Sequence, residues 1–553
     1  MKKLHIFTAL LCMCGTLVAQ SDIQKSRSHS YDYSQLSWTD AVDSLNTIMA
    51  ERYAFTEWKA IDWNEKILDL RPKIEEAEEN NDSVAFFRAL QQYLFSVPDG
   101  HISILNLPDY YKTSIAGGTF GFNMCPVDDG SVLVSVLVEG SDAWIAGMRT
   151  GDKILKWNGV NIDEIGELEN LNTFSNYATI QSRLYSRYLM LGRDSIGAMA
   201  TITYSSSDNI VHQVDITAVD DNMELLRTGF FNTVTFYNSD SIVTYNILEN
   251  NIGYFRIQAE MAPGETIDDI LAYPDFIKME NAIKYFNENH VEKLIVDLRL
   301  NNGGNDLQAA VSMGLFFETP SLYEYITATC DNNYEVIHTL YTEPLSTLFT
   351  GEIAVLVDPN CISTGEGMAM MFNRLENAHI VSHWGTNGSF GMVDWEPVAM
   401  PLGIAVNLPQ ARSLNENMEI QIDSDSTLKG GIDPDIKVPL NREAIIQQWQ
   451  NGVDVQLEYA KGYLLSTDES DFNSDLQVYP IPCSDILTVR SNSSFLKDSR
   501  IAIYNLSGDR LIYEKASNQS NTFMVDVSNF RKGLYFYNIS KNSKNVSGKF
   551  MVN

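Results

Sequence analysis

Short apolar runs alternate with helical stretches between about residues 251 and 463, and this pattern constrains the fold more than any other feature. The strand candidates are residues 253–257, 294–298, 353–357 and 379–382, and the helical candidates are residues 267–289, 307–317 and 366–377. Continuous Ile, Val and Leu runs between helices are typical of strands that are buried on both faces of a sheet. The sequence therefore predicts an α/β core with helices on both sides of the sheet.

Two short segments directly follow strand candidates and carry the candidate chemistry. The first reads Asp297-Leu298-Arg299-Leu300-Asn301-Asn302-Gly303-Gly304-Asn305. The second reads Cys361-Ile362-Ser363-Thr364-Gly365-Glu366 and leads into an apolar helical stretch. Together they predict a serine at the start of a helix, close to a loop whose backbone N–H groups can bind an anion. An acyl-transfer site needs both of these, a nucleophile and donors for the oxyanion.

Each segment also has a purely structural interpretation. Ser363 and Glu366 have the spacing of a capping box, in which the hydroxyl caps the helix and the carboxylate returns to the serine N–H. Arg299 is suited to binding a substrate carboxylate, and equally to an internal ion pair with Asp297. The oxyanion donors expected from these segments are the N–H of Gly303 or Gly304, where glycine permits close approach, and the N–H of Thr364 at the helix start.

Together, the two segments resemble the tail-specific, or C-terminal processing, serine protease family. Its nucleophile is the serine of a Ser-x-x-Glu segment after a buried strand, matched here by Ser363 and Glu366. Its glycine-rich loop has the form Leu-Arg-x-Asn-x-Gly-Gly, matched here by residues 298–304. The resemblance covers about residues 35–440, and it implies a mixed α/β, crotonase-like protease core over residues 219–463.

The general base departs from the commonest pattern of that family, which is a lysine in a downstream Gly-Lys step. The chain has no lysine between Lys293 and Lys429, and the corresponding place reads Gly385-Thr386-Asn387-Gly388-Ser389-Phe390-Gly391. A branch similar to the tricorn protease core uses a histidine in an Asp-x-His-x-Ser segment, matched here by residues 99–103. The resemblance therefore implies His101 as the base, and His383, which is closer to Ser363 in sequence, is the rival.

A third group is expected to orient the imidazole. In the histidine-using branch it is a glutamate just before a Gly-x-x-Pro-Asp step, which is residues 431–435 here. Leu428 and Lys429 stand where this acid belongs. Four nearby carboxylates remain open as substitutes: Glu416, Glu419, Asp423 and Asp425.

Two further units precede the core. Residues 35–110 show apolar positions at helical spacing and predict a small helical domain that ends at the turn Val97-Pro98-Asp99-Gly100. Residues 117–218 resemble a PDZ domain through the helix–turn–strand stretch 141–155, with Gly121 and Phe122 where the carboxylate-binding loop belongs. The resemblance implies that these two residues bind peptide substrate. The alternative is a module that only packs against its neighbours.

The last unit, residues 475–553, has short alternating strands with Ser, Asn and Asp at the turns, which predicts a β-sandwich. It resembles the C-terminal sorting domain of type IX secretion cargo, although Tyr479-Pro480-Ile481-Pro482 replaces the usual Tyr-Pro-Asn-Pro opening. The resemblance implies the type IX machinery as a partner, in a Gram-negative, Bacteroidota-like cell, and a final location on the cell surface or in the medium. The alternative is an ordinary accessory β-sandwich.

Composition limits the other classes of function. A length of 553 residues fits about three or four domains. Residues 1–20 read as a secretory signal peptide whose apolar run is too short to span a membrane. A formal net charge of −33 disfavours nucleic acid and anionic lipid as partners. The cysteines after the signal show no metal-ligand spacing, and the sequence predicts neither a metal nor a cofactor: Cys125, Cys330, Cys361 and Cys483.

These patterns predict an exported serine peptidase that uses Ser363 and His101 to cleave peptide or protein substrates bound with the help of the PDZ-like unit. The alternative is a catalytically decayed relative that keeps the peptide groove and acts as an extracellular peptide-binding or scaffold protein.

Overall fold

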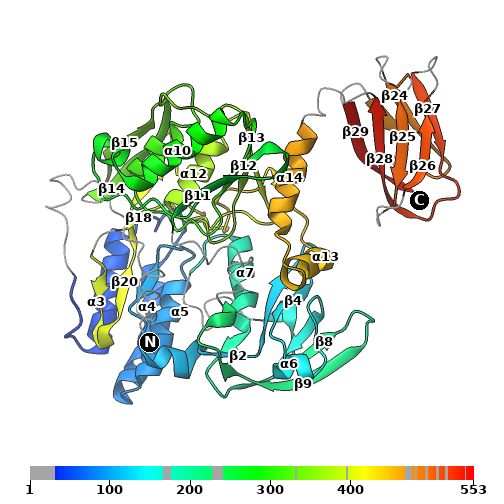
Figure 1. The fold of residues 1–553 in the computed structure, drawn as a ribbon. Coiled ribbons are helices and arrows are strands. Elements are labelled where there is room, and N and C mark those ends of the chain that lie inside the picture. The colour runs from blue at the N-terminus through cyan, green and yellow to red at the C-terminus, as the bar shows by residue number, and fades with distance from the viewer. Residues whose placement is uncertain are drawn as a thin grey trace. The chain divides into compact units, whose positions relative to one another are not determined.

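The computed structural model describes residues 31–165, 176–226, 241–330, 333–393, 396–467, 476–479, 483–491, 496–497, 499–505, 510–516, 521–541 and 544–552. The expected signal peptide lies outside these residues. The chain divides into two compact units, residues 1–460 and 461–553 (Figure 1).

A six-stranded sheet organises the larger unit, with the order β11-β12-β13-β16-β17-β22. β11 runs antiparallel to β12, and the remaining neighbours are parallel. Every residue of β13 is buried, as expected for a strand covered on both faces. The strands are β11 (Val243–Ile247), β12 (Ile252–Ile257), β13 (Lys293–Asp297), β16 (Glu352–Leu356), β17 (Ala378–Ser382) and β22 (Ile436–Lys437).

Helices α10 (Pro274–Glu288), α11 (Asp306–Met313) and α12 (Thr364–Phe372) pack their apolar side chains into the core of this sheet. The four predicted strands are confirmed, and the helical stretches 307–317 and 366–377 contain α11 and α12, which end earlier, at Met313 and Phe372. The third helical stretch needs a correction. The stretch 267–289 is two helices, α9 (Ile267–Leu271) and α10, because Pro274 has no N–H to donate and starts a new helix.

A second, four-stranded sheet, with the order β15-β14-β21-β18, belongs to the same unit. The sequence pattern did not predict its long hairpin of β14 (Ser321–Cys330) and β15 (Asn333–Thr342). Its other strands are β21 (Pro409–Leu414) and β18 (Met392–Val393).

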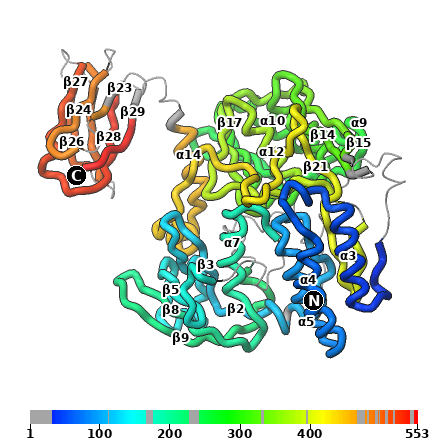
Figure 2. Tube along the Cα trace, turned by 180° about the vertical axis from the view of Figure 1, so that it is seen from behind, coloured from blue at the N-terminus to red at the C-terminus, as the bar shows by residue number. Residues whose placement is uncertain are grey.

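The N-terminal helices are α3 (Trp38–Arg52), α4 (Trp63–Glu79) and α5 (Ser83–Phe95). Side chains of Ser37, Asp62 and Asp82 cap their first turns. Their apolar faces share one core with residues of β19 (Val398–Ala399) and β20 (Ala405–Asn407), and Figures 1 and 2 show β20 beside α3. The short strand β1 (Ser103–Leu105) also pairs with β20. The helices predicted as a small domain are thus joined to the protease region by a common core.

Residues 118–220 form a mixed module around the strand order β3-β4-β5-β8-β9. The helix and the strand of the PDZ-like stretch 141–155 correspond to α6 (Asp142–Ile145) and β5 (Lys153–Trp157), and β4 (Val132–Leu137) precedes them. α7 (Ile180–Leu191) packs against the edge strand β3 (Phe122–Pro126). The remaining strands are β2 (Gly118–Thr119), β6 (Val160–Asn161), β7 (Arg193–Asp194), β8 (Met199–Ser205), β9 (Val211–Thr217) and β10 (Val219–Asp220).

The smaller unit is a β-sandwich, as predicted. One sheet has the order β23-β24-β27 and the other the order β26-β25-β28-β29, with one apolar core between them. The strands are β23 (Leu476–Tyr479), β24 (Ile486–Ser491), β25 (Arg500–Tyr504), β26 (Arg510–Lys515), β27 (Thr522–Asp526), β28 (Gly533–Lys541) and β29 (Lys544–Val552).

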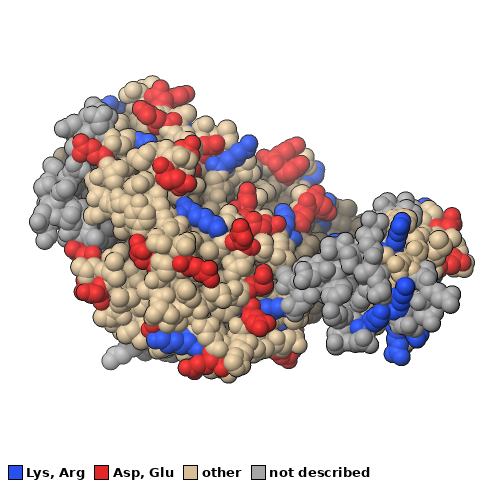
Figure 3. Space-filling view, turned by 90° about the horizontal axis from the view of Figure 1, so that it is seen from above, with Lys and Arg blue, Asp and Glu red and all other residues tan. Residues whose placement is uncertain are grey.

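Two surface properties complete the description. In the ranges that the structure describes, no helix has the length and apolar character needed to cross a membrane. Figure 3 shows Asp and Glu side chains spread over the face of the larger unit in view, in line with the net charge of −33.

Candidate active site

Ser363 stands at the bend that leads into α12, one residue before the helix begins. Its backbone has φ 59° and ψ −134°, a strained conformation for a residue with a side chain. Its hydroxyl makes no helix-capping hydrogen bond, and the residue is 6% exposed. A sharp, strained turn into a helix is the backbone geometry that directs a serine hydroxyl away from its own helix, as a nucleophile requires.

Glu366 does not return to Ser363 as a capping box requires. Its carboxylate accepts hydrogen bonds from the N–H of Gly388 at 2.7 Å and of Ser389 at 2.8 Å. The N–H of Ser363 donates instead to the carbonyl of Ser389 at 2.9 Å. The capping-box alternative is wrong, because Glu366 holds the loop after β17. Burial raises the pKa of Glu366 to about 8, and these hydrogen bonds oppose the rise.

The glycine-rich loop lies directly against Ser363. β13 and β16 are parallel neighbours, so the loops that follow them leave from the same edge of the sheet. Gly303 has φ 79°, and a Cβ atom placed on it would lie 2.5 Å from the Cβ of Ser363 and 3.0 Å from its Oγ. Only glycine fits at this distance.

The three expected oxyanion donors differ in their surroundings. The N–H of Gly303 donates to Asn301 Oδ1 at 2.8 Å, so it is already engaged. Thr364 is the first residue of α12, where a backbone N–H has no partner within the helix. Gly304 follows Gly303 in the same loop. Gly304 and Thr364 are therefore the better-suited pair.

His101 is buried, with 4% exposure, in the loop that leads into β1. Its backbone N–H donates to Asp99 Oδ1 at 2.9 Å, and its ring Nδ1 lies 3.9 Å from the same oxygen. Tyr53 donates its hydroxyl to Asp99 Oδ2 at 2.7 Å. Neither ring nitrogen of His101 has a hydrogen-bond partner among the described residues. Burial lowers the pKa of His101 and so favours the neutral imidazole, the form that accepts a proton.

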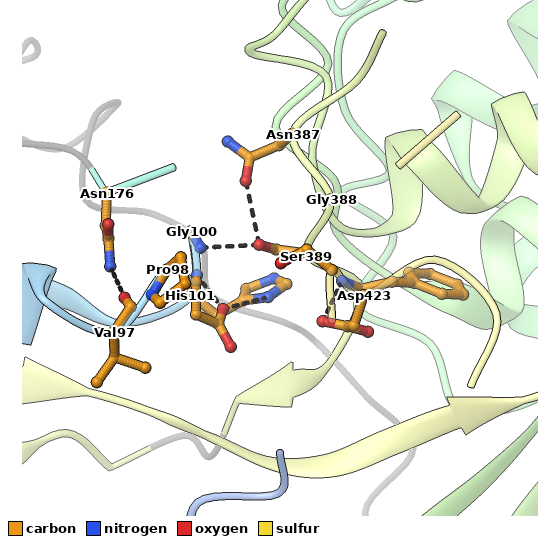
Figure 4. A network of polar contacts seen from close by, with 12 residues as sticks. Val97, Pro98, Gly100, His101, Asn176, Asn387, Gly388, Ser389 and Asp423 are labelled. Carbon is orange, nitrogen blue, oxygen red and sulfur yellow. Dashed lines mark hydrogen bonds and ion pairs between the residues drawn. The ribbon is translucent and has the colours of Figure 1, made fainter. Parts of the chain in front are cut away.

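Ser389 connects the serine loop to the histidine loop, and Figure 4 shows its bond to Gly100 on the histidine side. Its carbonyl accepts the N–H of Ser363, and its hydroxyl accepts the N–H of Gly100 at 2.8 Å. The hydroxyl also donates to Asn387 Oδ1 at 3.1 Å. Gly100 packs so closely that a Cβ atom on it would lie 2.5 Å from Ile362 Cδ1. The segments around residues 100 and 363, far apart in sequence, thus both hydrogen-bond to Ser389.

Comparison with known families identifies two parts of the chain. Residues 251–438 match the model of Peptidase family S41. The chain contains a peptidase family S41 domain. Residues 477–553 match the model of the Secretion system C-terminal sorting domain. No curated protein sequence matches the chain.

Solved structures support the same fold. Mature CPAF is similar, with 15% sequence identity, 79% of this chain and 98% of that chain covered, and a TM-score of 0.57. Mature CPAF complexed with lactacystin gives 14% identity, 79% and 99% coverage, and a TM-score of 0.55. At these identities the likeness establishes the fold alone. The family S41 domain implies a protease, and the sorting domain implies export to the cell surface or the medium of a Bacteroidota cell by a secretion machinery.

The S41 match contains Ser363 and the glycine-rich loop, but His101 lies outside it. The rival His383 lies inside the match and has different surroundings. Its Nδ1 is 3.0 Å from the carbonyl of Val438, and its N–H donates to Gln456 at 3.1 Å. Val438 directly follows β22, and Gln456 lies in α14 (Val455–Thr467). Burial lowers the pKa of His383 to about 4.

Among the four candidate acids, only Asp423 is buried, with 3% exposure. Its Oδ1 accepts the N–H of Phe390 at 3.1 Å, and its Oδ2 has no partner among the described residues. Figure 4 places Asp423 beside Ser389, on the side toward which the His101 ring points. Burial raises the pKa of Asp423 to about 7, and the charge of Asp99 adds to the rise. Glu416 and Glu419 are exposed, and Asp425 is partly exposed.

Arg299 forms an internal ion pair, which confirms the structural alternative. Its Nη2 lies 2.6 Å from Asp297 Oδ2 and 2.8 Å from Asp454 Oδ2. This guanidinium is buried and engaged by two carboxylates, so it anchors the start of the glycine-rich loop.

The expected peptide-binding residues are occupied by the chain itself. The N–H of Gly121 donates to Thr119 Oγ1 at 3.2 Å, and Phe122 is fully buried. In the next position, Asn123 donates its side-chain amide to the carbonyl of Leu225 at 2.7 Å. Leu226 then packs against three residues of α7: Tyr185, Leu189 and Met190.

Sequence reasoning missed two members of the site. In the sequence, Ser389 stands out only as part of the segment that lacks a lysine. Lys59 lies far from Ser363 along the chain, outside the segments that carry the candidate chemistry. Lys59 lies in the turn after α3, and its Nζ donates to the carbonyls of Pro98 and Ser424. No local pattern marks such a residue, since only the fold brings it near His101.

Proposed function

We propose that the protein is an exported serine peptidase, with Ser363 as the nucleophile and His101 as the general base. The observation that carries this proposal is the position of Ser389, which binds the backbone of both residues' loops. The strained bend at Ser363 and the adjacent glycine-rich loop supply the other requirements of acyl transfer. The use of His101 as the base would make the protein similar to the tricorn-like branch of the family.

The reaction begins when Ser363 Oγ attacks the scissile carbonyl and His101 accepts the hydroxyl proton. The N–H groups of Gly304 and Thr364 stabilise the oxyanion of the tetrahedral intermediate. The resulting imidazolium lies close to Asp99, and Asp423 is the third group, the acid that orients the imidazole. His101 then gives the proton to the leaving amine, and a water molecule hydrolyses the acyl-enzyme by the same steps.

Peptide binding is expected to complete the serine–histidine contact. Both ring nitrogens of His101 lack hydrogen-bond partners within the described residues, so the bond to Ser363 is not formed in this state. Such bonds are often long in ligand-free enzymes and shorten in the substrate complex. For the PDZ-like unit, binding of a peptide at Gly121 and Phe122 requires Leu225 and Leu226 to move away from β3 and α7.

The same unformed bond favours a second candidate, a decayed peptidase that binds peptides as a scaffold. A fluorophosphonate probe, which reacts with activated serines, separates the two. We expect the purified protein to be labelled at Ser363, labelling to be lost in Ser363→Ala, and a fluorogenic peptide library to be hydrolysed. A folded protein that is neither labelled nor active would establish the scaffold instead.

A further inference from the structure

We propose that Lys59 is a positioning residue for the His101 base, in that its buried ammonium clamps the Asp99–His101 loop to the Asp423 loop. The inference rests on the proposed function, because it assigns Lys59 to the base of that mechanism. Lys59 is 6% exposed. Its Nζ donates to the carbonyl of Pro98 at 2.9 Å, to the carbonyl of Ser424 at 2.7 Å and to Ser424 Oγ at 2.7 Å. These three bonds use all three donors of an ammonium group.

The two loops that Lys59 joins each carry a buried carboxylate. Pro98 directly precedes Asp99, which is fully buried, and Ser424 directly follows Asp423. The same N-terminal turn holds the second loop again, because Trp58 donates its indole N–H to the carbonyl of Asp423 at 3.0 Å. The clamp therefore sets the position of both carboxylates relative to His101.

Charge gives Lys59 a second effect on the histidine. A buried carboxylate is costly unless a cation or hydrogen bonds compensate it, and two such groups lie here together. Burial lowers the pKa of His101, the charge of Asp99 opposes this, and the charge of Lys59 lowers it further. The titratable groups that surround His101 come from four segments of the chain: Asp99, Lys59, Tyr53, Asp423 and Glu366.

A packing role alone does not require a cation at this place. Lys66, in α4, offers a matched control because it also binds the segment before Asp99, donating to Ser96 Oγ at 2.8 Å. Lys66 is less buried and binds the chain three residues before Asp99, at Ser96. A comparison of the two lysines separates an effect on His101 from general support of this segment.

The experiment uses the full chain with Lys59→Met, Lys59→Gln, Lys59→Arg and Lys66→Met. The Gln variant retains donors for the two carbonyls and serves if the Met variant fails to fold. The first readout is the pH dependence of kcat/KM on a fluorogenic peptide. The second is the imidazole pKa of His101, followed by NMR in protein with selectively labelled histidine and assigned with His101→Gln.

We expect both neutral variants to lose about tenfold or more in kcat/KM at neutral pH. The pH at which kcat/KM falls on the acid side, and the imidazole pKa of His101 followed by NMR, should both rise by about one pH unit. The reason is that a neighbouring positive charge is gone. Lys59→Arg should keep the wild-type limb, and Lys66→Met should match the wild type in both readouts. Neutral variants with an unshifted His101 titration would overturn the proposal. If the wild type hydrolyses nothing but His101 still shifts in the variants, the proposed function fails and the link between Lys59 and His101 stands.

Discussion

The surroundings of His101 and His383 differ although both side chains are buried, with 4% and 2% exposure. His383 follows β17, its Nδ1 lies 3.0 Å from the carbonyl of Val438, and only its Nε2 lacks a hydrogen-bond partner among the described residues. Both ring nitrogens of His101 lack a hydrogen-bond partner within the described part of the chain, the carboxylate of Asp99 lies 3.9 Å from its Nδ1, and its loop is attached to Ser389. We therefore expect the base to be His101, which is far from Ser363 in sequence, and not the nearer His383. Nearness along the chain is a poor guide to a site that forms at the edge of a sheet.

The largest expected effect is the loss of activity on removing the Ser363 hydroxyl, which tests whether this serine is the nucleophile. Ser363→Ala should remove several orders of magnitude of peptide hydrolysis, because no other group replaces the hydroxyl. The free energy of unfolding should change by less than about 1 kcal/mol, since this hydroxyl makes no cap bond to lose. Turnover and chemical denaturation of the same preparation check both statements. Undiminished turnover would exclude the serine mechanism and leave the comparison of histidines without a function.

The next test acts on the comparison directly. His101→Ala should lower kcat/KM by about a hundredfold or more, as expected for loss of a general base, while His383→Ala should retain most of it. In the wild type, activity should fall as the pH drops through the pKa of His101, because the protonated ring cannot accept a proton. Burial places this limb below the ordinary histidine value of 6.5. A dead His383→Ala enzyme beside an active His101→Ala enzyme would reverse the assignment.

A smaller effect is expected from the carboxylate that completes the His101 site. Asp423→Asn should lower kcat by about tenfold to a hundredfold, because the imidazolium loses a buried acceptor beside it. Asp425→Asn is the matched control, since its carboxylate caps the exposed turn at Thr427 and should leave kcat unchanged. Both are measured as kcat and KM on one peptide substrate. Equal rates for the two variants would remove Asp423 from the mechanism.

His383 should instead appear in the stability of the protein. Burial lowers its pKa to about 4 in the folded protein, against 6.5 for the unfolded chain. The stabilisation from keeping this ring neutral is complete above the unfolded pKa and is lost as the pH falls from about 6.5 toward 4, by about 3 kcal/mol at most. His383→Gln should remove that part of the acid sensitivity, seen as a flatter unfolding midpoint between about pH 7 and pH 5. An unchanged slope would show that His383 titrates normally.

The smallest effect on catalysis is expected from removing the C-terminal unit, which contains no histidine. A chain that ends near Ser474 should hydrolyse peptides at the wild-type rate, because the sandwich has its own core. In the native cell the same truncation should hold the protein in the periplasm. Fractionation of cells checks the second statement: a truncated protein on the surface would contradict the sorting role. A soluble but inactive truncated enzyme would show that the sandwich supports the catalytic unit.

Local sequence patterns alone indicated four strands of the six-stranded sheet, its helices, the sandwich, and the meeting of Ser363 with the glycine-rich loop. Apolar runs, Pro274 and paired glycines act on the backbone within a few residues, and the loops after parallel strands necessarily share one edge. The sequence also contained the Asp99 to Ser103 segment that indicated His101.

Only the tertiary structure decided which alternatives hold. It surrounds His101 and His383 with different partners, and it buries Asp423 alone among the four candidate carboxylates. It also places the Glu366 carboxylate against the N–H of Ser389, and Lys59 against the segment before Asp99. The physical reason is that burial, hydrogen-bond partners and counter-charges depend on segments hundreds of positions apart, which periodicity and spacing do not encode. Lys59 and Ser424 are 365 positions apart, and nothing near either residue in the sequence points to the other.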